Sequence, residues 1–332
     1  MTTTTRLIDG FGRRADNLRI SVTDRCNFRC RYCMPEEGME WLKKNLLLSF
    51  EEISRLVRIF AGLGVTKIRL TGGEPLMRKD LPTLVRMISS TGAVGDIAMT
   101  TNGYFLKEQA LALVEAGLTR VNVSLDSLDP ATFTAMVRRE YFDRTWEGIE
   151  EALRVGLGPV KLNAVLIRGI NDHEIPAFAE LARTRPVIIR FIEFMPIGSD
   201  DGWSIDRVVP TREVLDRLNA IAPLVPVEDP LRKAAADAYR FADGKGEIGV
   251  ISSVTEPFCG DCNRIRITSD GRLRTCLFSL TETDLRGMLR GGAPDAAIAD
   301  AIVDAVAHKE EGHLINRPGF VRPDRTMSSI GG

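Results

Sequence analysis

Three cysteines in the spacing C-x3-C-x2-C, Cys26, Cys30 and Cys33, constrain this 332-residue chain more than any other feature. Three thiolates this close cannot all pair as disulfides, and a tetrahedral structural zinc would need a fourth ligand that the segment lacks. A four-iron cluster tolerates the shortage, because three thiolates can hold it and leave its fourth iron open to a non-protein ligand. The spacing therefore favours an iron–sulfur cluster over a zinc site completed from a distant part of the chain.

A second triad lies near the end of the chain, at Cys259, Cys262 and Cys276, in the spacing C-x2-C-x13-C. The two triads account for all six cysteines. A C-x2-C start is common to zinc knuckles, and His308 or His313 could complete such a site. For this triad taken alone, a zinc site and a second iron–sulfur cluster are equally good interpretations.

Composition narrows the class of protein. Hydrophobic residues make up 44% of the chain and charged residues 27%, which is typical of a soluble globular protein. A net charge of −1 argues against a broad nucleic-acid surface, although a local group of arginines can still bind one anionic ligand. The first ten residues carry no apolar leader, and no apolar run is long enough to span a bilayer. We therefore expect a cytoplasmic protein with reduced cysteines that binds neither membrane nor nucleic acid.

Short apolar runs rich in β-branched residues alternate with amphipathic segments from residue 18 to residue 194, which is the pattern of repeated βα units. A capping box from Ser49 to Glu52 predicts the start of the first helix, which continues to Phe60. Parallel strands joined in this way can close into a barrel or stay open, and ligands bind at their carboxyl ends. The expected strands are Leu18–Val22, Lys67–Leu70, Asp96–Thr101, Arg120–Leu125, Val160–Ile167 and Val187–Phe194.

The alternation weakens beyond Pro210, and the proline-rich stretch 221–230 is typical of a connector. We place a domain boundary there, with residues 1–225 in the first domain and 226–332 in the second. The second domain is expected to contain strands at 238–241 and 247–251. A hairpin formed by 264–269 and 272–276 is expected to turn at Asp270-Gly271.

The sequence Arg264-Ile265-Arg266-Ile267 opens that hairpin directly after the second triad. Strand alternation would send both guanidinium groups to one face and both isoleucines to the other. Two arginines on one face suit a polyphosphate, because each can donate paired, charge-assisted hydrogen bonds. The alternative is a solvated edge strand whose charges prevent aggregation.

The first triad, with an aromatic residue before its last cysteine, resembles the signature of the radical S-adenosylmethionine (SAM) superfamily. The resemblance implies a partial (β/α)6 barrel of the TIM type and a [4Fe-4S] cluster whose open iron binds SAM and cleaves it to a 5′-deoxyadenosyl radical. The positions that match SAM-contacting residues of the superfamily are Tyr32, Gly73, Ser124 and Met195. Without the resemblance, Ser124 would be interpreted as a turn residue and Met195 as a core-packing residue.

The two triads, the sequence Asn263-Arg264-Ile265-Arg266 and the final Gly331-Gly332 together resemble the GTP 3′,8-cyclase family. The resemblance implies a second [4Fe-4S] cluster on the second triad. It also implies conversion of GTP to 3′,8-cyclo-7,8-dihydro-GTP, the first step of molybdenum cofactor biosynthesis. The family pattern gives catalytic roles to Arg264, Arg266, Gly331 and Gly332. It gives GTP contacts to Arg19, Arg69, Thr100, Lys161, Arg264, Ile265 and Arg266.

The same resemblance implies a reducing electron donor, a homodimer, and delivery of the product to cyclic pyranopterin monophosphate synthase. Two alternatives stay open. Another radical SAM enzyme with an auxiliary cluster, such as a peptide modifier, would not need phosphate-binding arginines. A zinc-binding module that contacts RNA would contain zinc and no iron.

Overall fold

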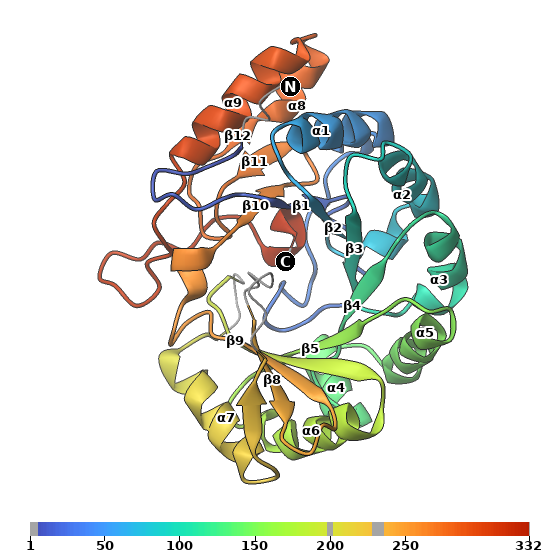
Figure 1. Cartoon of the computed structure of the whole chain (residues 1–332), viewed down its shortest axis with the longest axis vertical. Helices are drawn as coiled ribbons and strands as arrows, with labels where there is room; N and C mark the ends of the chain where they lie inside the picture. Colours follow the sequence, from blue (N-terminus) through green and yellow to red (C-terminus); the bar gives the residue numbers. More distant parts are fainter. Residues whose placement is uncertain (1–5, 198–201, 228–235, 332) are drawn as a thin grey trace.

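A single curved sheet organises the part of the chain that the structure describes. The computed structural model describes residues 6–197, 202–227 and 236–331. These residues form a 12-stranded sheet in the order β12-β11-β10-β1-β2-β3-β4-β5-β6-β9-β8-β7. The sheet bends into an arc, with α1, α2, α3, α5, α6 and α7 around its outer side (Figure 1). The arrangement confirms the predicted partial barrel with a C-terminal extension.

The six predicted βα strands are present, each within one residue of its expected ends. All of them run parallel to their neighbours. Their bounds are β1 Asn17–Ser21, β2 Lys67–Thr71, β3 Asp96–Thr101, β4 Arg120–Ser124, β5 Val160–Leu166 and β6 Val187–Glu193.

Helices cover the outer face and bury the apolar side of the strands. The predicted capping box is confirmed at the start of α1, because the Ser49 side chain accepts from the backbone of Glu52 and the Glu52 side chain accepts from the backbone of Ser49. Leu18 and Ile20 of β1 are fully buried on this side. The helices are α1 Phe50–Gly62, α2 Leu81–Ser89, α3 Leu106–Glu115, α4 Pro130–Val137, α5 Phe142–Arg154, α6 Ile175–Thr184, α7 Thr211–Asn219, α8 Leu285–Arg290, α9 Asp295–Ala307 and α10 Met327–Ile330.

The C-terminal part of the chain extends the same sheet at both ends. β9 pairs with β6 and β10 pairs with β1, both in parallel, so these two strands lengthen the arc. The predicted hairpin is confirmed, because β10 and β11 pair in antiparallel fashion around residues 268–271. The remaining strands are β7 Leu224–Pro226, β8 Asp237–Phe241, β9 Glu247–Ile251, β10 Arg264–Ile267, β11 Arg272–Arg274 and β12 Thr283–Asp284.

One local prediction was wrong in this region. Leu224–Pro226, which we predicted as part of a connector, forms the edge strand β7 and pairs with β8. A proline is tolerated there because an edge strand leaves one row of backbone groups unpaired. The domain boundary between residues 225 and 226 stays a prediction. Within the described ranges, no helix has the length and apolar character needed to cross a membrane.

Candidate active site

A cavity of about 560 Å³ lies on the inner face of the arc, and both cysteine triads line it. This volume lies within the range of ligand and cofactor sites. All six cysteines are free thiols. The fold thus brings segments from both ends of the chain to one site. The predicted site residues that line the cavity are Arg19, Cys26, Cys30, Tyr32, Cys33, Arg69, Gly73, Thr100, Ser124, Lys161, Met195, Cys259, Cys262, Arg264, Arg266 and Cys276.

The loop that carries the first triad is fixed to the end of α4. The backbone N–H of Arg29 donates to the carbonyl of Val137, and that of Arg31 donates to the carbonyl of Met136, each at 3.0 Å. The Arg29 guanidinium also donates to two carbonyls of its own loop. These bonds hold the loop backbone in one place, so the three thiols keep a fixed arrangement at the cavity wall.

The cysteines of the first triad are half-buried, and their surroundings favour protonated thiols in the absence of a metal. Burial raises the pKa of Cys26 and of Cys33 to about 12, and it raises the pKa of Cys30 well above the usual thiol value. Metal coordination removes the proton from a thiol. The positive charge of a bound metal centre would therefore lower the pKa values of these thiols and stabilise them as thiolates.

Two glycines let the end of β2 approach the backbone just before the first triad. A Cβ on Gly72 would lie 2.4 Å from the carbonyl oxygen of Thr23, and one on Gly73 would lie 2.4 Å from that of Arg25. The N–H of Gly73 donates to Thr23 at 2.8 Å, and the N–H of Glu74 donates to Arg25 at 2.7 Å. Any side chain at Gly72 or Gly73 would push these two segments apart.

Asp126, which follows β4, links the first triad to the sheet. Its carboxylate accepts from the Tyr32 hydroxyl at 2.7 Å and from the backbone N–H of Val165 at 2.9 Å. Burial raises the pKa of Asp126 to about 6, although both hydrogen bonds lower it. Ser124 lines the same cavity two residues earlier. The carboxylate therefore fixes the orientation of the Tyr32 ring beside the cysteines.

Three arginines on neighbouring strands form a row across the inner face. Arg266 of β10 is in register with Arg19 of β1, and Arg19 is in register with Arg69 of β2. Residues in register on adjacent strands point to the same face about 5 Å apart. Arg264 lies in the same way beside Asn17. All four guanidinium groups line the cavity, as strand alternation predicted for β10.

In this arginine row (Arg19, Arg69, Arg264 and Arg266), Arg69 and Arg266 are buried, Arg19 and Arg264 are half-buried, and the like charges repel one another. Burial lowers the pKa of Arg69 to about 9 and that of Arg266 to about 10, with neighbouring arginines adding to the shift. The pKa of Arg19 is lowered by burial and by the other three arginines. The Nε atoms of Arg19 and Arg69 are buried and make no hydrogen bond within the described structure. A ligand with several negative charges would satisfy these donors and relieve the repulsion.

A lysine from the segment after α9 supports the second triad. Lys309 is 4% exposed, and its Nζ donates to the carbonyls of Cys262 and Arg264 at 3.0 and 2.7 Å and lies 3.6 Å from the Cys262 sulfur. Burial raises the pKa of the Cys262 thiol, but Lys309, Arg264 and Arg266 outweigh burial and hold that pKa below its usual value. Burial instead raises the pKa values of Cys259 and Cys276, so the positive environment is local to Cys262.

Arg13 fastens the N-terminal segment to the same triad. Its guanidinium donates to the carbonyls of Cys259 and Glu311 at 2.6 Å and of Glu310 at 2.5 Å. Its Nε pairs with Asp9 at 2.6 Å, and both side chains are almost fully buried. One arginine thus holds together the residues before β1, the second triad and the segment after α9.

We expect Arg13→Ala to lower the free energy of unfolding by about 3–5 kcal/mol, because the substitution leaves the Asp9 carboxylate buried without its cation. Anaerobic chemical denaturation measures the change. Arg14→Ala is the matched control, since Arg14 is exposed and its one bond, to Gly64, is at the surface. That control should change stability by less than about 0.5 kcal/mol. Equal stability of the two variants would contradict the role given to Arg13.

The end of the chain enters this site. Gly331 is buried, and its carbonyl accepts from the Arg266 guanidinium. A Cβ on Gly331 would lie 2.7 Å from Thr71 Cγ2 and 3.2 Å from the Cβ of Ser21, and its φ is +81°. A glycine is required there, because both the close approach and the positive φ disfavour a side chain. Gly332 lies outside the described residues.

Two predicted residues do not line the cavity: Gly331, which contacts Arg266 from behind the lining, and Ile265. The side chain of Ile265 is fully buried on the helix-covered side of β10, and the residue does not line the cavity. Strand alternation explains this, since Arg264 and Arg266 occupy the inner face on either side of it. His313 lines the cavity, whereas the side chain of His308 is 78% exposed at the end of α9.

Comparison with known proteins identifies the family. The radical SAM superfamily model matches residues 20–182, and the Molybdenum Cofactor Synthesis C model matches residues 187–315. A GTP 3′,8-cyclase of Pelotomaculum thermopropionicum is 49% identical over 98% of this chain and 99% of its own length. One of Paenarthrobacter nicotinovorans is 46% identical over 98% and 97%. The chain belongs to the GTP 3′,8-cyclase family.

Solved structures support the same fold for this GTP 3′,8-cyclase family member. SuiB of Streptococcus suis, solved bound to S-adenosylmethionine, superposes with a TM-score of 0.63. The match covers 94% of this chain and 77% of that protein, at 15% sequence identity. At this identity the likeness concerns the fold alone.

Membership of the radical SAM superfamily implies SAM and a [4Fe-4S] cluster, and the first triad fits both. Its three free thiols supply the sulfur ligands that such a cluster uses. The side-chain oxygens of Asn122 and Asn163 are buried without a partner in the described structure and could accept hydrogen bonds from a ligand. Among residues 6–197, 202–227 and 236–331, no three His, Cys, Asp or Glu side chains converge on a single-ion site. A cluster makes no such demand, because each thiolate binds a different iron.

Sequence reasoning missed several residues of this GTP 3′,8-cyclase family site. Lys309 and Arg13 are single cations without a motif around them, so nothing in their spacing separates them from surface residues. Asp126 was detectable, because it stands at the carboxyl end of a predicted strand beside Ser124. Asn122 and Asn163 were also detectable, since amides in buried parallel strands need a partner.

Proposed function

We propose that this chain converts GTP to 3′,8-cyclo-7,8-dihydro-GTP, the first step of molybdenum cofactor biosynthesis. The observation that carries the proposal is that the arginine row and both cysteine triads face one cavity. A zinc module that contacts RNA would not need a second cysteine triad in the same cavity. A peptide modifier would not need four arginines lining it.

The proposed cofactors are two [4Fe-4S] clusters and SAM. Cys26, Cys30 and Cys33 would hold the first cluster, and Cys259, Cys262 and Cys276 the second. Bound SAM and the first cluster supply a 5′-deoxyadenosyl radical. The SAM contacts proposed from the family pattern are Tyr32, Gly73, Ser124 and Met195.

The residues of this chain would bind and orient GTP. The arginine row, together with Thr100 and Lys161, would hold the triphosphate by charge-assisted hydrogen bonds. Burial of these groups excludes water, which strengthens each bond and protects a reactive intermediate from side reactions. Holding C3′ and C8 of GTP in a fixed relation to the SAM site lowers the entropic part of the barrier to forming the bond between them. A contact from Ile265 would have to come from its backbone.

The second triad and the C-terminal tail would complete the site next to β10. Lys309 and Arg13 position the backbone of Cys262 and Cys259, so they would keep the second cluster at a fixed place. Three further proposals come from the family resemblance alone: a reducing electron donor, a homodimer, and delivery of the product to cyclic pyranopterin monophosphate synthase. The cytoplasmic location is proposed from the composition and the N-terminal sequence, and the domain boundary between residues 225 and 226 from the proline-rich stretch 221–230.

The proposal is tested with anaerobically purified, reconstituted protein. Iron and sulfide should be present, and incubation with GTP, SAM and a reductant should give a product with the formula of GTP and a new bond between C3′ and C8. NMR of the isolated product detects that bond. Zinc without iron in the reconstituted protein would end the cyclase proposal, and iron with no GTP binding in a titration would favour another radical SAM enzyme.

Deletion of Gly331 and Gly332 should leave the iron content unchanged and suppress cyclisation. The physical reason is that the deletion removes the carbonyl bonded to Arg266 but no cysteine ligand. Iron assay and product formation, measured on the same preparation, give the two readouts. Full activity in the truncated protein would remove the role proposed for the tail.

A further inference from the structure

The C-terminal helix that reaches the site cannot hold itself in place. α10 has four residues, and a helix of that length has no stability of its own in water. Yet residues of this helix and the glycine after it reach the cavity. Met327 and Ser328 line the cavity together with the first triad, and the carbonyl of Gly331 accepts from Arg266. An anchor outside the helix must therefore fix its position.

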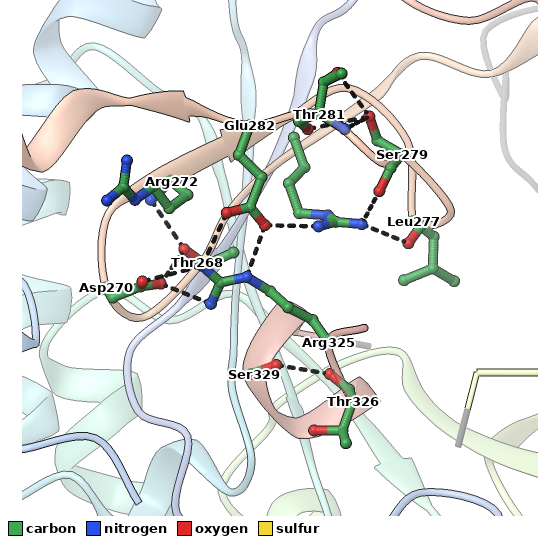
Figure 2. Close-up of polar contacts among 11 residues, drawn as sticks. Thr268, Asp270, Arg272, Leu277, Ser279, Thr281, Glu282, Arg325, Thr326 and Ser329 are labelled. Carbon is green, nitrogen blue, oxygen red and sulfur yellow. Dashed lines mark hydrogen bonds and ion pairs between the residues drawn. The ribbon is translucent and has the colours of Figure 1, made fainter. Parts of the chain in front are cut away.

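Arg325, two residues before α10, makes the strongest contacts of this segment. Its guanidinium donates to both carboxylate oxygens of Asp270 at 3.1 Å. It also reaches both oxygens of Glu282, with Nη2 to Oε2 at 2.8 Å and Nε to Oε1 at 2.7 Å. Figure 2 shows Arg325 extended toward these two acids, with Thr326 and Ser329 below it in the view. One side chain thus makes paired bonds to two carboxylates.

The two acids are themselves held by the hairpin and the loop after it. Asp270 accepts from the Thr268 hydroxyl at 2.6 Å, and Glu282 accepts from Arg274 at 2.6 Å (Figure 2). The side chain of Arg325 is 25% exposed, Asp270 11%, Glu282 20% and Arg274 3%. Ion pairs in such a partly buried network are screened less than exposed pairs. The network is therefore a firm attachment point on the β10–β11 hairpin.

The same hairpin contacts the tail at a second point. Asp270 is in the turn, and Arg266 lies four residues earlier on β10 with its guanidinium at the cavity. The tail is bonded to the turn through Arg325 and to the strand through Gly331. Attachment at both points sets where Gly331 meets Arg266. The tight packing of Gly331 against Thr71 leaves little tolerance for a shift.

We propose that Arg325 is the positioning residue of the C-terminal tail: its ion pairs with Asp270 and Glu282 place α10 so that Ser328 lines the cavity and Gly331 meets Arg266. This inference rests on the proposed function for its effect on turnover. Thr326 and Ser328, whose hydroxyls reach the sulfur of Met39 at 3.4 and 3.5 Å, add weaker support. Arg325 itself does not line the cavity.

Hydrogen exchange of the reconstituted protein tests the proposal directly. In Arg325→Gln, amide exchange in residues 327–331 should become at least tenfold faster, with exchange in β1–β6 unchanged. Turnover should fall at least tenfold while KM for GTP stays within twofold. Arg325→Lys keeps the charge but loses the paired geometry, so it should recover part of both losses. Arg317→Gln, the same change at an exposed arginine eight residues earlier, should behave as wild type.

Two further variants keep the proposal testable if Arg325→Gln does not fold. Asp270→Asn and Glu282→Gln each remove one partner of Arg325, and each should accelerate exchange in the same five residues. Unchanged tail exchange in these variants, or unchanged turnover despite faster exchange, would overturn the proposal. If wild-type protein forms no cyclised product, the proposed function fails, while the exchange experiment still decides whether Arg325 holds the tail.

Discussion

Replacing Arg264 and Arg266 together by alanine should weaken GTP binding by about 10²–10⁴-fold. Both guanidinium groups lie in the cavity on the inner face of β10. A hydrogen bond to a charged group contributes about 1.5–3 kcal/mol, so losing one from each arginine removes about 3–6 kcal/mol of binding. Titration of the anaerobic protein with GTP measures the loss.

The fold should survive this double substitution. Burial lowers the pKa of both arginines, which means that the folded protein holds these charges at a cost when no anion is bound. Removing them should leave the unfolding midpoint unchanged or raise it. Arg272→Ala is the matched control on the same hairpin, because its side chain pairs with Asp284 at 3.0 Å and does not line the cavity. Equal losses of GTP affinity in control and double variant would contradict the role of the arginine row.

Local sequence patterns predicted the strands of the arc because each strand carries its own signal. Buried, β-branched runs such as Val160–Leu166 are bounded by turn residues, and the Ser49–Glu52 capping box depends on four neighbouring residues. The placement of β9 and β10 carries no local signal. Each pairs in parallel with a strand far away in sequence, β9 with β6 and β10 with β1, and such pairing is decided by the assembled fold.

The chemical roles of the cysteines and arginines could be predicted from the sequence, but their arrangement in space could not. Spacing alone separated the two triads, strand alternation singled out Arg264 and Arg266, and the family resemblance added Arg19 and Arg69. The row itself depends on register: Arg266, Arg19 and Arg69 are neighbours only because three strands align without a slip. A shift of one residue would turn each arginine into the core. The sequence was enough to identify these residues, but only the folded sheet shows that the like-charged arginines lie next to one another.

Residues that support the site were the hardest to predict. Arg13, Lys309 and Arg325 each act through backbone carbonyls or single acids, and such partners leave no pattern in the sequence. Their environment distinguishes them only in the folded protein. Arg13 and Lys309 are buried cations, and buried cations are rare unless paired or bonded. All three lie outside the β1–β6 arc. Lys309 and Arg325 hold the segments after α9 against the residues around β10 and β11, and Arg13 holds the residues before β1 against the second triad.

Changing Cys33 to alanine should abolish turnover and reduce iron from about eight to about four atoms per chain, since two four-iron clusters are proposed. The expected loss exceeds 100-fold, because altering even the outer partners of a metal ligand costs about 10–100-fold. Iron assay and product formation are measured on the same anaerobic preparation. The second triad should keep its iron, because Lys309 and Arg13 hold Cys262 and Cys259 independently of the first loop.

Cys262→Ala is the matched variant at the second triad, and it should lose the other half of the iron. With the first triad intact, this variant should still cleave SAM when a reductant is supplied, whereas Cys33→Ala should not. Cyclised product should be absent from both variants. The two centres would then have separate roles, one in forming the radical and one in holding the substrate. SAM cleavage by Cys33→Ala, or unchanged iron in either variant, would contradict the assignment of the triads.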